Sequence, residues 1–142
     1  MGLKLEHVSY LYGTDTELLV RALDDVNLEI PDGQFIGLIG HTGSGKSTLV
    51  QHLNGLLKPS EGTILFNGEN IWAQDYSRKT LRSKVGLVFQ YPEHQLFETD
   101  VLADVCYGPK NLGLEQGEIE RRAKKALELV GFPEEFFGQS PF

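Results

Sequence analysis

The chain has 142 residues, a hydrophobic content of 40%, a charged content of 23% and a formal net charge of −7. This size and composition are typical of one soluble globular domain, and the negative charge argues against a nucleic-acid-binding surface. A single cysteine, Cys106, excludes an internal disulfide, and no apolar run approaches the ~18 residues of a membrane-spanning helix.

A succession of strands is expected over the first two thirds of the chain, because apolar and polar residues alternate or form short apolar runs. These strands cover residues 3–12, 26–30, 35–39, 63–66, 69–71 and 85–89. The runs at 35–39 and 85–89 are apolar throughout, which is typical of central strands covered on both faces. Residues 13–16 are turn material, Pro31-Asp32-Gly33 is a strong turn signal, and Asn67-Gly68 suits the type I′ turn of a hairpin.

Three helices are expected as well. The first follows residue 47 and ends around Asn54-Gly55, and the second covers 101–107, begun by Thr99 or Asp100 and stopped before Pro109. The third covers 118–130 and is capped by Gly131. Its apolar stripe consists of Ile119, Ala123, Ala126, Leu127 and Val130. Antiparallel hairpins followed by buried strands and helices predict an α/β fold with an antiparallel β portion.

The most informative segment is a glycine-rich loop between the predicted strand 35–39 and the first helix. It reads Gly40, His41, Thr42, Gly43, Ser44, Gly45, Lys46, Ser47 and Thr48, a G-x-x-x-x-G-K-[ST] pattern in a strand–loop–helix context. Glycines let the backbone wrap a polyphosphate, and the helix N-terminus adds free N–H groups and a positive dipole end. Lys46 would neutralise the β- and γ-phosphates, and Ser47 would offer a hydroxyl to Mg²⁺. The loop therefore predicts binding of a nucleoside triphosphate.

Two residues outside the loop narrow the class of protein. Tyr12 and Gln90, each at the end of a predicted strand, stand where the ATP-binding subunit of an ABC transporter has an aromatic and a glutamine. The sequence resembles that family over its whole length. The resemblance implies that Tyr12 stacks on adenine and that Gln90 reaches Mg²⁺ and the attacking water, which makes Lys46 and Gln90 the catalytic candidates. The His41 side chain is expected to point away from the phosphates.

A segment after Gln90 narrows the family further. Pro92-Glu93-His94-Gln95-Leu96-Phe97, followed by Tyr107-Gly108-Pro109, is similar to the ATPases of energy-coupling factor importers, which take up vitamins and transition-metal ions. Glu93-His94 and Gly108-Pro109 resemble the second of their two non-identical ATPase subunits. The resemblance also implies that Tyr91, Pro92, Leu96 and Phe97 help to receive a helix of the membrane partner. The alternative is that Leu96 and Phe97 only cover the core.

The resemblance carries expectations for the whole protein. It implies a P-loop NTPase core at about 1–90, the start of a helical subdomain at 91–142, and ATP with Mg²⁺ as cofactors. The implied partners are a second ATPase subunit, a transmembrane coupling subunit and a substrate-binding membrane subunit. The implied location is the cytoplasmic face of the membrane, held peripherally.

Motifs that complete catalysis in this family are not found in residues 1–142. The Leu-Ser-Gly-Gly-Gln signature and the apolar strand ending in Asp-Glu are both missing. We therefore expect an N-terminal fragment that binds ATP without hydrolysing it, from a parent protein that powers an importer. An ATPase of another importer class and an ATP-binding module without a transport role remain alternatives. A small-molecule kinase is disfavoured by Tyr12 and Gln90.

Overall fold

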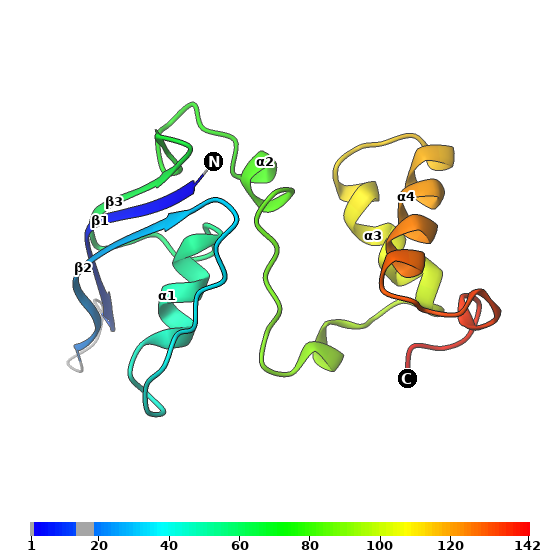
Figure 1. Ribbon diagram of the computed structural model, residues 1–142, viewed down its shortest axis with the longest axis horizontal. Coiled ribbons are helices and arrows are strands. Elements are labelled where there is room, and N and C mark those ends of the chain that lie inside the picture. Colours follow the sequence, from blue (N-terminus) through cyan, green and yellow to red (C-terminus); the bar gives the residue numbers. More distant parts are fainter. Residues whose placement is uncertain (1, 14–18) are drawn as a thin grey trace. The chain divides into compact units, whose positions relative to one another are not determined.

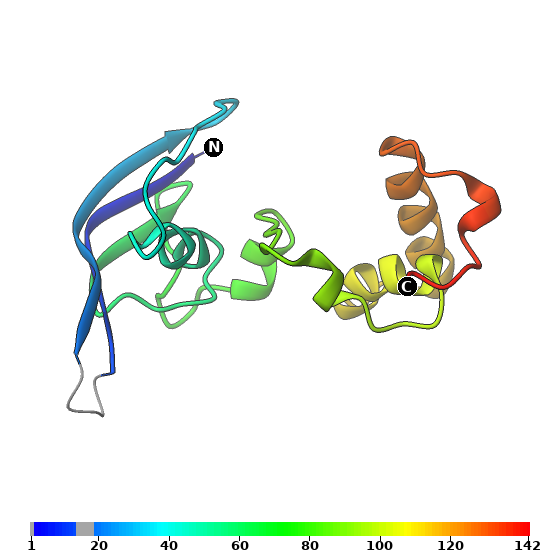
Figure 2. The ribbon, with the colours of Figure 1, turned by 90° about the horizontal axis from the view of Figure 1, so that it is seen from below.

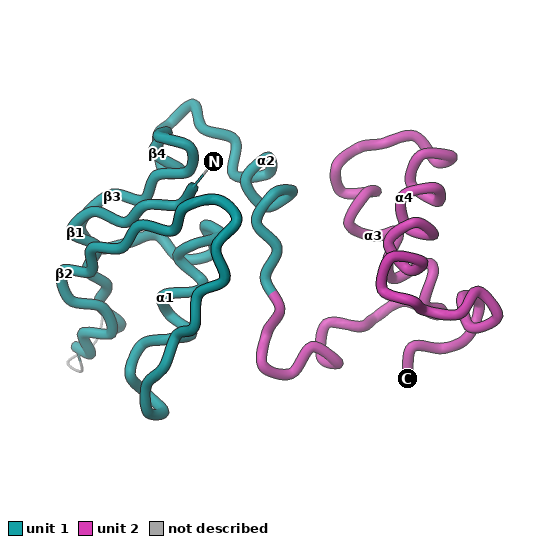
Figure 3. The backbone as a smooth tube through the Cα atoms, viewed as in Figure 1, with its two compact units in different colours: residues 1–87 teal, residues 88–142 magenta. Residues whose placement is uncertain are grey.

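The computed structural model describes residues 2–13 and 19–142 of the chain (Figure 1). It divides into two compact units, residues 1–87 and residues 88–142 (Figure 3). The predicted turn at 13–16 lies outside the described residues except for Gly13. Within the described residues, no helix is both long and apolar enough to cross a membrane.

The first unit is built on an antiparallel sheet. Its strands are β1 (Gly2–Tyr12), β2 (Val20–Pro31), β3 (Glu61–Phe66) and β4 (Glu69–Asn70), in the order β2-β1-β3-β4. All three pairings are antiparallel, as predicted for this portion of the chain. Asn67 and Gly68, with φ values of 55° and 83°, form the predicted tight turn between β3 and β4.

The core of this unit lies between the sheet and two helices, α1 (Lys46–Leu53) and α2 (Arg78–Arg82). Figures 1 and 2 show α1 on one face of the curved sheet. The buried core residues are Leu5, Val8, Leu23, Leu49, Ile64, Ile71 and Leu81. Leu5 and Val8 of β1 lie three residues apart rather than at a strict spacing of two, because the pairing of β1 with both neighbouring strands shifts register between them.

The predicted strands at 35–39 and 85–89 are wrong. Neither segment forms a strand, and Phe35, Ile39 and Val88 are exposed by 102%, 96% and 81%. A central strand exists only through ladder hydrogen bonds to neighbours on both sides. Among the described residues every paired strand belongs to the antiparallel sheet, so neither apolar run has such a neighbour.

The second unit consists mainly of α3 (Val101–Asn111) and α4 (Gln116–Leu129), which pack against each other, with short 3₁₀ turns at η1 (Pro92–Gln95) and η2 (Glu134–Phe136). Asp100 caps α3 as predicted, because its side chain accepts a hydrogen bond from the amide of Ala103 at 2.8 Å. Pro109 does not stop the helix. It lies in the last turn, which the Leu112 amide closes by donating to the carbonyls of Gly108 and Pro109.

Helix α4 buries a narrower stripe than the sequence predicts. Ile119, Ala123 and Leu127 are buried, whereas Ala126 and Val130 are exposed. The predicted cap is confirmed: Gly131 has φ 72°, its amide donates to Glu128, and the amide of Phe132 donates to Leu127. These paired bonds form the Schellman motif, which requires a left-handed residue at the position of Gly131.

A histidine lies in the core of the first unit. His52 of α1 is fully buried; its Nδ1 lies 2.7 Å from the carbonyl oxygen of Thr48, and its Nε2 has no hydrogen-bond partner in the described structure. Burial lowers the pKa of His52 below its ordinary value of 6.5, partly opposed by the Thr48 carbonyl. The neutral imidazole is therefore the form that the fold accommodates.

We predict that His52 makes the chain less stable in mild acid. Its folded pKa is depressed, so below about pH 6.5 the unfolded chain binds more protons, and the unfolding free energy falls by at most about 1.4 kcal/mol per pH unit. Urea denaturation between pH 7.5 and 5.5 should show this slope in the natural chain and a flatter one in His52→Gln. Equal slopes would contradict the prediction. Glu118, whose pKa is lowered to about 2, titrates below this window.

Candidate functional site

The glycine-rich loop is held against the sheet by a contact that only glycine permits. Gly45, the N-cap of α1, has φ 89°, and a Cβ placed there would lie 2.4 Å from the carbonyl oxygen of Ala22 in β2. A Cβ on Gly40 would lie 2.6 Å from Ser44 Oγ, across the loop. Gly43 also has a positive φ, 82°, but open space around it. The pattern of glycines thus reflects both backbone conformation and close packing.

Lys46 occupies the inside of the loop. Its ammonium donates to the carbonyl oxygens of Gly40 and His41, each at 2.7 Å, and approaches Ser44 Oγ at 3.4 Å. These acceptors carry only partial negative charge. A phosphate oxygen offers the same ammonium a stronger, charge-assisted partner. The lysine is therefore poised to exchange loop carbonyls for an anion.

The N-terminus of α1 is open to an anion as well. No side chain caps it, and its first turn contains no acidic residue. The unsatisfied amides of a first turn and the helix dipole together favour negative charge. Ser47 is exposed at this end of the helix, so its hydroxyl is accessible. The wrapped loop, the Lys46 ammonium and the open helix end together fit a polyphosphate.

Tyr12 lies beside this helix. Its hydroxyl is 3.2 Å from Thr48 Oγ1, and the residue is 42% exposed. Thr48 itself is buried, and its hydroxyl contacts that of Tyr12. The structure thus places together the aromatic residue and the phosphate loop that the sequence singles out separately.

Gln90 and His41 are the remaining site residues that the sequence predicts. Gln90 is exposed and belongs to the second unit, so the described geometry of the first unit does not include it. The His41 ring is exposed, with Nδ1 2.9 Å from the carbonyl oxygen of Thr42. No group of three or more His, Cys, Asp or Glu residues that could hold a metal ion is found in the part of the chain that the structure describes.

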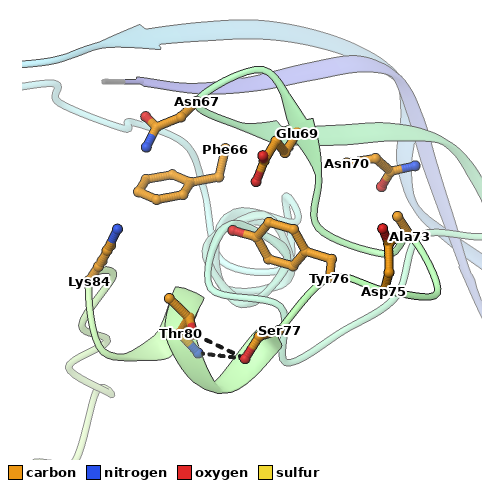
Figure 4. Close-up of a pocket in the computed structure, with 10 residues that line it drawn as sticks. All are labelled: Phe66, Asn67, Glu69, Asn70, Ala73, Asp75, Tyr76, Ser77, Thr80 and Lys84. Atoms are coloured by element: carbon orange, nitrogen blue, oxygen red, sulfur yellow. Dashed lines mark hydrogen bonds between the residues drawn. The ribbon is translucent and has the colours of Figure 1, made fainter.

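Sequence reasoning did not anticipate a cavity of about 490 Å³ between the β3–β4 hairpin and α2 (Figure 4). It is lined by Phe66, Asn67, Glu69, Asn70, Ala73, Asp75, Tyr76, Ser77, Thr80 and Lys84, none of them part of the phosphate loop. The lining contains two carboxylates, those of Glu69 and Asp75, and one ammonium, that of Lys84, and burial together with Glu69 raises the pKa of Tyr76. The charge balance disfavours a polyphosphate, which needs positive groups and N–H donors. The loop is therefore the better phosphate site.

Comparison with known proteins points to one family. The family described as "ABC transporter" matches residues 23–140. Among curated proteins, the chain is 52% identical to the energy-coupling factor transporter ATP-binding protein EcfA2 of Caldanaerobacter subterraneus subsp. tengcongensis, covering all of this chain and 50% of that protein. The EcfA2 protein of Clostridium tetani is 50% identical, with the same coverage. The chain thus spans about half the length of the curated relatives it matches.

Solved structures agree with this similarity. CbiO1 from Clostridium perfringens, part of the ABC transporter complex cbiONQ, is 42% identical, with a TM-score of 0.74 over 95% of this chain and 52% of that one. A dimeric post-hydrolysis state of the ATP-binding cassette MJ0796, bound to ADP and Pi, is 28% identical. Its TM-score is 0.78 over 98% of this chain and 61% of that one. The predicted α/β fold of a P-loop NTPase is confirmed by these likenesses.

The packing of Gly45 gives a direct test of the loop. Gly45→Ala is expected to destabilise the chain by more than the roughly 1–2 kcal/mol that a left-handed alanine costs, because its Cβ also meets the Ala22 carbonyl. Gly43→Ala is the matched control, since φ is similar there but nothing lies within 4 Å. Urea denaturation of both variants measures the difference, and equal losses would show that the contact with β2 does not constrain the loop.

Proposed function

Because the chain belongs to the ABC transporter family, we propose that it is the nucleotide-binding part of an ATPase subunit that powers an energy-coupling factor importer of vitamins or transition-metal ions. The family implies ATP binding. The importer class is supported by the relatives named EcfA2, which are about half identical to this chain over its full length. The second of the two non-identical ATPase subunits, to which Glu93-His94 and Gly108-Pro109 point, is the preferred assignment.

The observation that carries the proposal is the position of Lys46 within the wrapped loop, at the open end of α1. In this proposal the ammonium leaves the carbonyls of Gly40 and His41 and binds the β- and γ-phosphates. The loop amides and the helix end hold the remaining phosphate oxygens. The ring of Tyr12, tied to the same helix, stacks on adenine.

The proposed metal is Mg²⁺, which would neutralise phosphate charge during phosphoryl transfer. The hydroxyl of Ser47 is the proposed ligand from the loop and Gln90 the proposed ligand from the second unit. Hard oxygen donors of this kind suit Mg²⁺, which takes few protein ligands beside a nucleotide. For residues 1–142 by themselves we propose binding without turnover, since they lack an acidic pair to orient the attacking water.

The proposed partners are a second ATPase subunit and the membrane subunits of the importer, at the cytoplasmic face of the membrane. The solved relatives include a dimeric cassette and a member of a transporter complex, which supports this assembly. In the second unit, Tyr91 and Phe97 flank η1 and are exposed by 57% and 58%. The Phe97 ring leans edge-on against Tyr107 at 4.7 Å, and the Phe97 amide donates to Asp104 Oδ1. Phe97 is thus held against α3 with more than half of its surface exposed, which supports a contact role for this segment.

Removing one charge tests the nucleotide site. Lys46→Ala is expected to weaken Mg-ATP by about 10- to 100-fold, the usual worth of a hydrogen bond to a charged group. Lys84→Ala, which removes the same charge from the cavity beside α2, is expected to leave the affinity unchanged. Isothermal titration calorimetry of both variants distinguishes the glycine-rich loop from the cavity as the nucleotide site. If Lys84→Ala weakens Mg-ATP and Lys46→Ala does not, the nucleotide binds in the cavity.

Charged substitutions test the partner surface. The double variant Leu96→Glu and Phe97→Glu is expected to abolish co-purification with the transmembrane subunit while leaving Mg-ATP affinity unchanged, because a carboxylate is costly in an apolar interface. The control is Leu129→Glu with Val130→Glu, a pair in the same unit that is 77% and 78% exposed. Normal assembly of the Leu96 and Phe97 variant would show that this segment is not the docking surface.

A further inference from the structure

Three rings, those of Tyr10, Tyr12 and His52, form a cluster at the end of β1, and Tyr10 contacts both of the others. The rings of Tyr10 and Tyr12 meet edge to face, with centroids 4.8 Å apart and planes at 89°. Tyr10 also meets the imidazole of His52, with centroids 4.7 Å apart and planes at 73°. Tyr10 is half-buried and packs on the core, and His52 is fully buried. The most exposed ring of the cluster is therefore supported from inside the protein.

Thr48 is hydrogen-bonded to both outer residues of this cluster, Tyr12 and His52. Tyr12 Oη lies 3.2 Å from Thr48 Oγ1, and His52 Nδ1 lies 2.7 Å from the Thr48 carbonyl oxygen. Thr48 is in the first turn of α1, two residues after Lys46. Thr48 thus joins the exposed ring of Tyr12 to the helix turn that bears Lys46.

We propose that Tyr10 and His52 are positioning residues that orient the ring of Tyr12 for stacking on the nucleotide base. Thr48 ties the oriented ring to the helix that holds the phosphates. This role rests on the proposed nucleotide site. Tyr12 is the last residue of β1 and 42% exposed, so its own burial cannot fix the ring plane. The perpendicular contact with the Tyr10 ring and the hydroxyl bond to Thr48 together restrict both the tilt and the swing of the Tyr12 ring.

Orientation matters because stacking requires the two planes to overlap. A base stacked on an aromatic side chain is worth roughly 5- to 150-fold in affinity. A ring free to swing loses part of this gain each time a base binds, since it must be ordered again. Inorganic tripolyphosphate has no base, so its binding is insensitive to the orientation of Tyr12. The ratio of the affinities for Mg-ATP and Mg-tripolyphosphate therefore distinguishes a loss of Tyr12 orientation from a general loss of stability, which would weaken both ligands.

The experiment measures Kd for Mg-ATP and for Mg-tripolyphosphate by calorimetry on the full chain. Tyr10→Leu is expected to weaken Mg-ATP by about 3- to 10-fold. Tripolyphosphate should stay within about twofold, the scatter expected of independent sites. Tyr10→Phe, which keeps the ring edge, should restore the natural Mg-ATP affinity. His52→Gln keeps a donor for the Thr48 carbonyl but removes the ring behind Tyr10, and it should reproduce the selective loss if Tyr10→Leu fails to fold.

A double variant shows whether Tyr10 acts through Tyr12. Tyr10→Leu combined with Tyr12→Leu should bind Mg-ATP no more weakly than Tyr12→Leu alone, within about twofold. Additive losses, or equal losses for both ligands in Tyr10→Leu, would overturn the positioning role while leaving the nucleotide site intact. If Tyr12→Leu itself lowers both affinities equally or neither, the stacking role of Tyr12 is wrong and the positioning role falls with it.

Discussion

The approach of the Gly45 backbone to the carbonyl of Ala22 is the constraint on which the phosphate loop depends. A Cβ on Gly45 would lie 2.4 Å from that carbonyl oxygen, so only glycine lets the helix N-terminus lie this close to the sheet. From this position, α1 lays Leu49 and His52 on the core and leaves Lys46 and Ser47 at its open end. One backbone contact thus sets both the packing of the helix and the direction of its dipole.

The positive charge of Lys46 meets only neutral acceptors within the loop. The Lys46 ammonium donates hydrogen bonds to the carbonyl oxygens of Gly40 and His41. This arrangement stabilises the wrapped shape without a ligand, yet the interactions are weaker than those a phosphate would make. The same ammonium therefore holds the loop in shape and is available to an anion, which reduces the reorganisation needed on binding.

Local signals in the sequence predicted local structure well. The Asn67-Gly68 turn, the Asp100 cap and the Gly131 cap each depend on the conformational preference of a few neighbouring residues, and each is present. Predictions that depend on distant partners were less successful. Residues 35–39 and 85–89 have the composition of central strands but no strand beside them in the described chain, and Pro109 is accommodated where a boundary was expected. Composition reports what a segment can bury, whereas ladder bonds decide whether it becomes a strand.

The spacing of Gly40, Gly45, Lys46 and Ser47 predicts a phosphate-binding loop by itself, because each residue type meets a local chemical need within eight consecutive positions. Tertiary structure alone decided that Gly45 must lie against β2, that Thr48 turns its hydroxyl to Tyr12, and that Tyr10 and His52 lie behind that ring. These contacts join residues up to 42 positions apart, from Tyr10 to His52, and no local pattern encodes them. They exist because the sheet and α1 share one core, and the close packing of that core sets which side chains meet.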